Sequence, residues 1–267
     1  MDKETTIFDK PEAISLTISR GEISFKEVSF SYDKQSKILD NISFVAHPGM
    51  MIAIVGASGV GKTTITNLIP RLYDVSGGRI EIDGIDIRDV TLSSLRKQIG
   101  IVMQDSYLFN GTIEENLRYG KNDATEEELI EACQAAFIHD FIMSLPQKYK
   151  TIVGNRGIKL SGGEKQRIAI ARVIIKNPKI IIFDEAISSL DSISEALIQK
   201  AMVPLLRDRT SFVIAHRLST ILAADQILVI ENGRIAEKGK HEELLARRGL
   251  YKKLYDTQFK CNIGMEA

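Results

Sequence analysis

The sequence contains little of what marks several common protein classes. It has two cysteines, Cys133 and Cys261, which lie far apart and match no metal-binding spacing, so reduced thiols are expected rather than a disulfide framework. Its 35 basic and 35 acidic residues cancel, which leaves no electrostatic footprint for general nucleic-acid binding. No apolar run approaches the roughly 18 residues of a membrane-spanning helix, and the strongest candidate, residues 168–175, contains Arg172. We therefore expect no nucleic-acid partner, and a chain that does not cross a membrane by itself.

Internal repeats and low-complexity tracts are also missing from the sequence. His139 and His241 have no other ligand types near them at metal spacing, so both are interpreted as structural. With 267 residues, 44% of them hydrophobic and 26% charged, the chain has the composition of an ordinary globular protein with a sizeable core and a smaller subdomain. The evidence for function therefore comes from motifs.

A complete phosphate-binding pattern, G-x-x-x-x-G-K-[ST], is present and is followed by Thr64. Its residues are Gly56, Ala57, Ser58, Gly59, Val60, Gly61, Lys62 and Thr63. An apolar stretch typical of a buried parallel strand precedes it at residues 50–55, and a segment that can be helical follows at residues 63–72. In such a strand-loop-helix, backbone N–H groups surround phosphate oxygens, Lys62 reaches the terminal phosphates, and Thr63 offers a hydroxyl to magnesium. The alternative, a glycine-rich turn that binds nothing, agrees less well with this context.

A second apolar strand, residues 180–183, ends in Asp184 and Glu185. It would bring both acids to the carboxyl edge of a parallel sheet, where such folds bind ligands. Asp184 is then placed to hold magnesium, directly or through water. Glu185 is the natural general base for the attacking water, a role that contributes on the order of 10² to 10⁴ in rate. The alternative for Glu185 is an acidic cap of the next segment.

The segment LSGGE, residues 160–164, is a helix start with an unusual feature. Ser161 and Glu164 form a capping-box pattern, and good helix formers fill residues 165–176 before an Asn-Pro stop. An ordinary helix start is one interpretation. Two adjacent glycines behind a serine cap, however, leave backbone N–H groups bare, which favours a second anion-binding helix end. If both helix ends bind the phosphates of one nucleotide, two molecular surfaces must meet around it.

Together these motifs resemble the nucleotide-binding domain of an ATP-binding-cassette (ABC) transporter of the exporter type, over residues 21–258. The resemblance implies ATP and Mg²⁺ as cofactors. It also implies a head-to-tail dimer, either a homodimer or a pseudo-symmetric heterodimer, in which the signature of one chain closes over the ATP held by the other. The signature residues that contact ATP in trans are then Ser161, Gly162, Gly163 and Glu164.

Four further residues match motifs of that family in the expected order. The resemblance implies that Tyr32 stacks on adenine, a contact of about 1 to 3 kcal/mol, and that Gln104 senses magnesium and the attacking water. Asp191, in the segment SSLD, would belong to the D-loop that crosses the dimer interface. His216 would contact the γ-phosphate as a second catalytic residue. Without these roles, Tyr32 would be an ordinary strand tyrosine and Gln104 a polar loop residue. Asp191 would belong to a capped turn, and His216 would be a structural histidine.

Two departures from the family pattern are visible. Exporters often read T-E-V-G-E-R-G shortly before the signature, whereas this chain reads T-I-V-G-N-R-G over residues 151–157. Both acidic positions are missing, so the charge pattern of a contact with the coupling helices of a membrane domain would differ. Ile187 also replaces a common threonine, and no functional consequence is attached to it.

The predicted fold is α/β. It has a P-loop NTPase core with a mostly parallel sheet, an antiparallel β subdomain and an inserted α-helical subdomain. Residues 1–20 are interpreted as a linker from a membrane domain and residues 259–267 as a tail. Within the ATPase domain, residues 21–90 form mainly the antiparallel subdomain around the phosphate loop. Residues 105–165 form the helical subdomain with the signature at its end, and residues 166–258 form the rest of the core.

The predicted function is ATP binding and hydrolysis that powers export across a membrane. The resemblance implies a transmembrane domain, fused or separate, that holds this otherwise soluble chain at the cytoplasmic face. An importer ATPase is the first alternative, and it would lack the linker-like start. A soluble cassette ATPase would usually need a second cassette or a long coiled coil. A regulatory module that binds ATP without turnover is disfavoured by Glu185 and His216. The transported substrate would be bound by membrane helices, so this sequence does not identify it.

Overall fold

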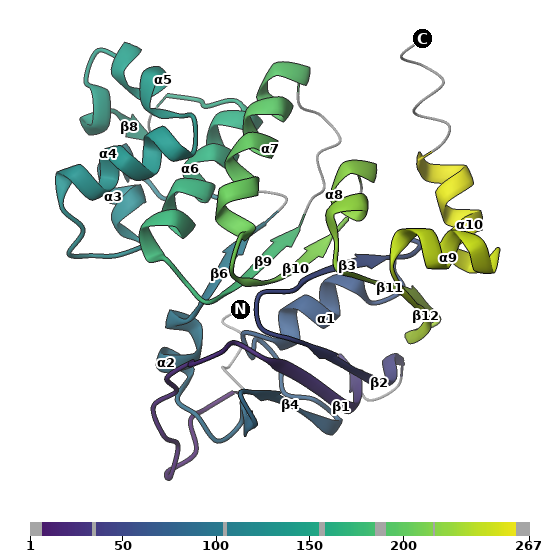
Figure 1. The fold of residues 1–267 in the computed structure, drawn as a ribbon. Coiled ribbons are helices and arrows are strands. Elements are labelled where there is room, and N and C mark those ends of the chain that lie inside the picture. The colour runs from purple at the N-terminus through teal and green to yellow at the C-terminus, as the bar shows by residue number, and fades with distance from the viewer. Residues whose placement is uncertain are drawn as a thin grey trace.

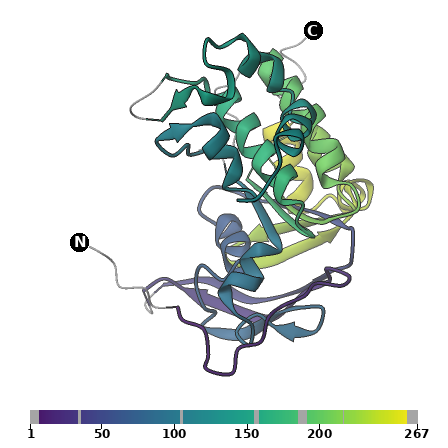
Figure 2. The same cartoon turned by 90° about the vertical axis from the view of Figure 1, so that its left-hand side faces the viewer.

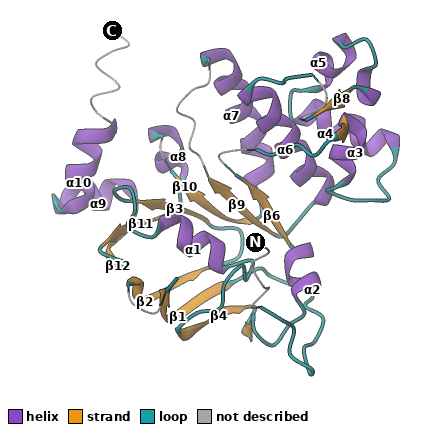
Figure 3. Ribbon diagram, turned by 180° about the vertical axis from the view of Figure 1, so that it is seen from behind, coloured by secondary structure: helices purple, strands orange, loops and turns teal. Residues whose placement is uncertain are grey.

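The computed structural model describes residues 7–33, 36–103, 106–154, 158–184, 191–215 and 217–259. Figure 1 shows two sheets with helix α1 (Lys62–Leu68) between them, and a group of helices on the other side of the larger sheet. The same layers are visible from behind in Figure 3, where α1 again separates the two sets of strands. The phosphate-loop helix is therefore enclosed by strands from both sides.

The larger sheet has six strands in the order β12-β11-β3-β10-β9-β6. Its pairs are parallel except β11 with β12. The strands are β3 (Met51–Val55), β6 (Ile99–Val102), β9 (Ile180–Asp184), β10 (Thr210–Ile214), β11 (Gln226–Glu231) and β12 (Arg234–Gly239). The inner strands are mostly apolar, as expected where helices or strands cover both faces of a sheet, although β10 begins with Thr210 and Ser211. The predicted parallel core is thus confirmed, and β3, which leads into the phosphate loop, lies inside it.

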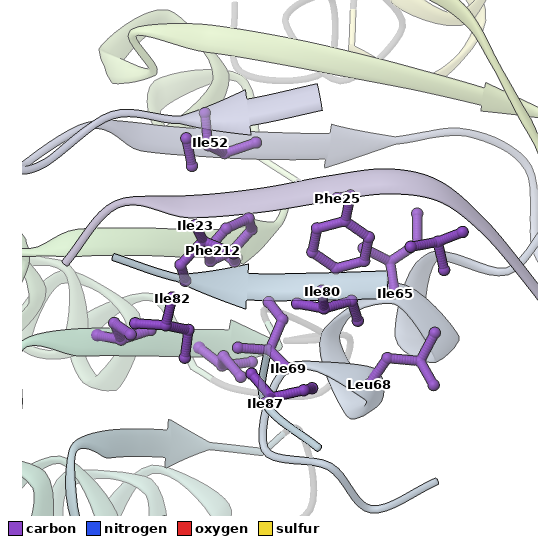
Figure 4. Close-up of a cluster of buried hydrophobic side chains, with 14 of the residues drawn as sticks. Ile23, Phe25, Ile52, Ile65, Leu68, Ile69, Ile80, Ile82, Ile87 and Phe212 are labelled. Carbon is purple, nitrogen blue, oxygen red and sulfur yellow. The ribbon is translucent and has the colours of Figure 1, made fainter. Parts of the chain in front are cut away.

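The smaller sheet is antiparallel, in the order β2-β1-β4-β5. Its strands are β1 (Ile23–Ser31), β2 (Lys37–Ala46), β4 (Gly77–Ile82) and β5 (Ile85–Asp86). Figure 4 shows how its apolar side chains meet those of α1: Phe25 and Ile80 lie beside Ile65 and Leu68. Phe25 also stacks on Phe44, with ring centroids 4.5 Å apart. This cluster fixes α1, and with it the phosphate loop, relative to both sheets.

The helical part of the molecule follows β6 and returns to β9, its neighbour in the larger sheet. It contains α3 (Ile113–Arg118), α4 (Glu126–Ala135), α5 (His139–Ser144), a 3₁₀ turn (Lys148–Lys150) and α6 (Gly162–Lys176), with the short strands β7 (Gly111–Thr112) and β8 (Ile152–Val153). Helix α2 (Leu92–Lys97) precedes β6. Capping boxes at Thr112 and Thr125 start α3 and α4, since each threonine side chain satisfies a backbone N–H of the first turn. Figure 2 shows this group standing apart from the antiparallel sheet.

Helices α7 (Ser192–Leu206) and α8 (Leu218–Ala223) pack beside the larger sheet, and the last elements lie near β11 and β12 (Figure 1). These last elements are α9 (His241–Arg247), α10 (Leu250–Leu254) and a π-helical turn (Tyr255–Phe259). The Tyr251 ring is buried, and its hydroxyl oxygen lies 2.6 Å from Nδ1 of His241. Within the ranges described, none of the helices combines the length and apolarity needed to cross a bilayer.

The segment before β1 is held against the antiparallel sheet. Leu16 and Ile18 are buried in the core cluster. The carboxylate of Asp83 accepts hydrogen bonds from the backbone N–H groups of residues 19–22, at 2.9 to 3.0 Å. Burial acts to raise the pKa of Asp83, but these backbone hydrogen bonds outweigh it and lower the pKa. A single carboxylate thus ties the segment to the turn after β4.

Candidate nucleotide site

The phosphate loop connects β3 to α1 and contains two glycines that other residues could not replace without strain. Gly56 has a φ of +152°, and a Cβ on it would lie 2.4 Å from the carbonyl oxygen of Ile230. Gly61 has a φ of +102° at the N-cap position of α1, and a Cβ there would lie 2.7 Å from Leu39. Left-handed backbone and close neighbours both require glycine at these positions. The conformation of the loop therefore requires glycine at both of these positions of the sequence pattern.

Lys62, the first residue of α1, reaches back over the loop. Its ammonium nitrogen donates to the carbonyl oxygens of Gly56 at 2.8 Å and Ala57 at 2.7 Å. Burial lowers the pKa of the Lys62 ammonium, and the negative charge of Asp184 partly opposes this shift. Asp184 ends β9, which is separated from β3 only by β10. The predicted cation and the predicted magnesium ligand therefore lie at the same edge of the sheet.

Tyr32 and Thr64 connect the two sides of the predicted ATP site. Tyr32 follows β1, and its hydroxyl oxygen lies 3.1 Å from the Thr64 hydroxyl oxygen on α1. Tyr32 is 53% exposed, so the residue is accessible to a base. Phe30 and Tyr73 contact it edge to face, with centroid distances of 4.8 and 5.1 Å and interplanar angles of 88° and 87°. Sequence reasoning missed Tyr73, because nothing in the sequence relates it to Tyr32.

The signature segment adopts the predicted helix start. The Ser161 side chain accepts a hydrogen bond from the Glu164 backbone N–H, and the Glu164 carboxylate accepts one from the Ser161 backbone N–H at 2.7 Å. Gly162 is exposed, whereas Gly163 is buried. Helix α6 then ends at Asn177, which takes the left-handed conformation expected of a helix cap.

The predicted D-loop residue Asp191 is the N-cap of α7. Its carboxylate accepts a hydrogen bond from the Ser194 backbone N–H at 2.9 Å. This backbone hydrogen bond is the main reason that the pKa of Asp191 is lowered. The capped turn, considered above as an alternative to a functional role, is therefore present in the structure.

Three predicted residues, Gln104, Glu185 and His216, lie outside the described residues. Their chain neighbours Met103, Asp184 and Ala215 stand at the ends of β6, β9 and β10. These three strands are adjacent in the sheet. The roles of the three residues stay predictions.

The oxygen ligands around the loop fit a magnesium ion. In the part of the chain that is described, no group of three or more His, Cys, Asp or Glu side chains could hold a metal. Magnesium bound with a nucleotide needs no such group, because it takes one or two protein oxygens and completes its shell with phosphates and water. The Asp184 carboxylate and the hydroxyl of the exposed Thr63 on α1 provide protein oxygens of this kind. The charge of Asp184 also acts on Lys62.

A buried polar network between the start of the helical part and α6 was also missed by sequence reasoning. Asn116 is fully buried; its side-chain oxygen accepts from the Phe109 N–H at 2.9 Å and its amide donates to the carbonyls of Phe109 and Thr112. Arg172 donates to Asn116 and to the Tyr107 carbonyl. Burial lowers the pKa of Arg172 to about 10. An arginine within an apolar run was the only sequence signal of this network.

Comparison with known protein families identifies the family to which this chain belongs. The family model described as ABC transporter matches residues 39–188, more than half of the chain. The chain belongs to the ABC transporter family. Its phosphate loop, Asp184 and signature segment all lie within the matched region. Family membership makes this chain an ATP-binding domain and an ATPase.

Relatives and a solved structure agree with this assignment. The ATP-binding/permease protein YgaD of Bacillus subtilis (strain 168) is 55% identical over 251 residues, which are 94% of this chain and 43% of that protein. The ATP-dependent lipid A-core flippase of Syntrophus aciditrophicus (strain SB) is 52% identical over 260 residues, 97% of this chain and 43% of that protein. A bacterial Atm1-family ABC exporter with ATP bound has a TM-score of 0.88 and 50% identity, over 94% of this chain and 44% of that chain.

The ABC chain thus spans less than half the length of these relatives. The likeness to an exporter-type nucleotide-binding domain is confirmed, and so is the α/β phosphate-loop fold.

Proposed function

We propose that this ABC ATPase domain powers export of a substrate across a membrane, through a transmembrane domain that is fused to it or separate. The observation that carries the proposal is the pair of glycine-containing helix starts, at α1 and α6, in different parts of the fold (Figure 1). Each has the composition of a phosphate-binding helix end. Two such ends serve one nucleotide when two domains meet head to tail, so that each ATP lies between the loop of one chain and the signature of the other.

In this proposal one set of residues binds the adenine base and another set binds the phosphates. Tyr32 stacks on adenine, while the backbone N–H groups of residues 56–63 and the Lys62 ammonium hold the phosphates. The contacts of Lys62 with Gly56 and Ala57 support this role, because they keep the ammonium over the loop. Thr64 stands between the two regions through its contact with Tyr32. Residues 161–164 of the second domain contact the γ-phosphate from the other side.

Mg²⁺ is the proposed metal cofactor, held by Thr63, Asp184 and Gln104. When bound with ATP, it neutralises charge on the phosphates and orients the group that is transferred. The protein residues carry the rest of the chemistry. Glu185 accepts the proton of the attacking water, and His216 contacts the γ-phosphate and keeps it aligned. Positioning of this kind accounts for most of the rate in phosphoryl transfer.

The resulting cycle couples ATP to movement. Binding of ATP closes the dimer, and hydrolysis with Glu185 as the base opens it, which drives alternating access in the membrane domain. The membrane domain would hold this chain at the cytoplasmic face. Names of relatives that specify a flippase and an exporter support export over the importer alternative. Neither name supports the other alternative, a soluble ABC ATPase that acts outside transport.

The test compares wild type with Glu185→Gln, using Glu131→Gln as a matched control because Glu131 is exposed on α4. Phosphate release and oligomeric state are measured with and without Mg-ATP. We expect Glu185→Gln to lose at least about 100-fold in turnover and to form a stable ATP-dependent dimer, while wild type and Glu131→Gln hydrolyse ATP and stay mostly monomeric. Wild-type turnover in Glu185→Gln would remove Glu185 as the base. Failure of every variant to dimerise would mean that the membrane domain supplies the closure.

A further inference from the structure

Gly163 packs directly against the first turn of the neighbouring helix. A Cβ on Gly163 would lie 2.7 Å from Cβ and 2.8 Å from Oγ of Ser194. Real Cβ atoms essentially never come this close to other heavy atoms, so the two helices meet here only because residue 163 has no side chain. Gly162, by contrast, is exposed. The two signature glycines therefore have different surroundings.

The residue that faces Gly163 is itself tied to Asp191. The Ser194 backbone N–H donates to the Asp191 carboxylate, which caps α7. Ser161 caps α6 in the same way through Glu164. Two capped helix starts thus lie side by side, one carrying the signature and the other carrying Asp191.

A buried cation lies at the same junction. Arg167 is one turn beyond Gly163 on α6 and is 6% exposed. Its Nη1 lies 3.5 Å from the position of a Gly163 Cβ. Nε and Nη1 have no hydrogen-bond partner among the described residues. Burial lowers the pKa of Arg167, and the charges of Glu164 and Asp191 oppose this shift. Arg167 is thus attracted to an acid of each helix start.

We propose that Gly163 is a positioning residue that joins the signature to Asp191. Its missing side chain lets α6 and α7 touch at Ser194, so that residues 161–164 and Asp191 move as one unit. The signature and Asp191 would then reach a facing domain together or not at all. This inference rests on the proposed function, because it concerns how the ATP-closed dimer is assembled. It differs from a role of Gly163 in nucleotide contact alone, since it makes the requirement for glycine depend on Ser194.

The test asks whether the requirement for glycine at position 163 depends on the side chain of Ser194. Gly163→Ala introduces the Cβ, and Ser194→Gly removes both atoms that it would meet. Ser194→Ala is the matched control, because it removes Oγ and keeps the Cβ that is 2.7 Å away. The set is completed by the two double variants, Gly163→Ala with Ser194→Gly and Gly163→Ala with Ser194→Ala. ATP turnover, binding of a fluorescent ATP analogue to the monomer, and thermal unfolding are measured for each.

We expect Gly163→Ala to lower turnover by about tenfold or more, with analogue binding to the monomer within about twofold of wild type. Adding Ser194→Gly should restore turnover to within about threefold of Ser194→Gly alone, whereas adding Ser194→Ala should not. If Gly163→Ala does not fold, the same contrast applies to thermal unfolding, and only Ser194→Gly should restore a folded protein.

Two results would overturn the inference: wild-type turnover in Gly163→Ala, or equal failure of both serine variants to restore it. The second result would assign Gly163 to nucleotide contact alone. The Glu185→Gln variant separates this outcome from a failure of the proposed function. If Glu185→Gln does not form an ATP-dependent dimer, the ATP-closed dimer on which this inference rests is not formed by these domains alone. If it does form the dimer and rescue is absent, only the coupling of Gly163 to Ser194 is wrong.

Discussion

The hydroxyl oxygen of Tyr32 lies 3.1 Å from the hydroxyl oxygen of Thr64. One residue follows a strand of the antiparallel sheet, and the other belongs to the phosphate-loop helix. The ring proposed to stack on adenine is therefore oriented by the same helix that carries Lys62. A base and its phosphates would be recognised by one connected set of side chains.

Truncation of Tyr32 should weaken ATP binding chiefly through loss of the ring. We expect Tyr32→Ala to cost about 1 to 3 kcal/mol, which is roughly 5- to 150-fold in Kd. Tyr32→Phe keeps the ring and loses only the contact with Thr64, so its effect should be below about fivefold. Calorimetric titration with ATP measures both, and Tyr119→Ala, which removes another exposed ring, is the control. Unchanged affinity in Tyr32→Ala would exclude stacking.

Tyr73 should act on ATP binding only through Tyr32. Its ring meets Tyr32 edge to face at 5.1 Å and also contacts Phe30 at 5.6 Å. We expect Tyr73→Leu to weaken ATP binding by about threefold, since an aromatic pair of this geometry contributes roughly 0.5 to 1.5 kcal/mol. In a Tyr32→Ala background the same substitution should have no further effect, which a double-mutant cycle measures. Additive losses would show that Tyr73 contacts the nucleotide directly.

Removal of the Lys62 ammonium should abolish most activity while leaving the fold intact. In Lys62→Met the phosphates lose their cation, so we expect ATP turnover to fall by at least about 100-fold. Lys97→Met, an exposed lysine at the end of α2, is the matched control and should behave as wild type. Near-wild-type turnover in Lys62→Met would contradict the assigned role. Thermal unfolding of both variants checks that the loss is not a folding defect.

Asp83 should stabilise the protein in a pH-dependent way. Its pKa is lower in the folded protein than the ordinary value of 3.8, so its contribution is present above that value and is lost as the pH falls through the folded pKa. Asp83→Asn keeps the shape but turns an amide group towards backbone N–H donors, which should cost roughly 1 to 3 kcal/mol at pH 7. Urea titrations from pH 6 to pH 3 should show the two proteins converging. A constant difference down to pH 3 would mean that the carboxylate charge is irrelevant.

Asn116 should contribute to the stability of the helical part of the molecule. Asn116→Ala leaves the Phe109 and Thr112 backbone groups without their side-chain partner in a fully buried place. We expect a loss of about 2 to 4 kcal/mol in the free energy of unfolding. The exposed Asn122→Ala is the control and should change the free energy by less than about 0.5 kcal/mol. A difference between the two variants below about 1 kcal/mol would contradict the network.

Features fixed by local rules could be predicted from the sequence. The phosphate loop, the capping box at Ser161 and the helix stop at Asn177 each depend on a few consecutive residues, and the structure has all three. The apolar runs before the loop and before Asp184 likewise indicated parallel strands. These signals also identified the family, because their order along the chain is specific.

Contacts between distant segments could not be predicted in the same way. Nothing in the local sequence pairs Gly163 with Ser194 or Tyr73 with Tyr32, because packing in three dimensions selects these neighbours. Arg172 was noticed only as an interruption of an apolar run, although it reaches Asn116 and Tyr107. The positions of Gln104, Glu185 and His216 relative to the loop stay predictions.

The order of strands in the larger sheet has a consequence for folding. Strand β3 leads into the phosphate loop, and both of its neighbours come from much later in the chain: Met51 pairs with Ser211 and Ile52 with Gln226. At a synthesis rate of about 5 to 20 residues per second, β3 waits roughly 8 to 30 s for β10 to leave the ribosome. Pairing over such sequence separations is slow even after release. The ability to bind nucleotide should therefore be among the last properties that a newly made chain acquires.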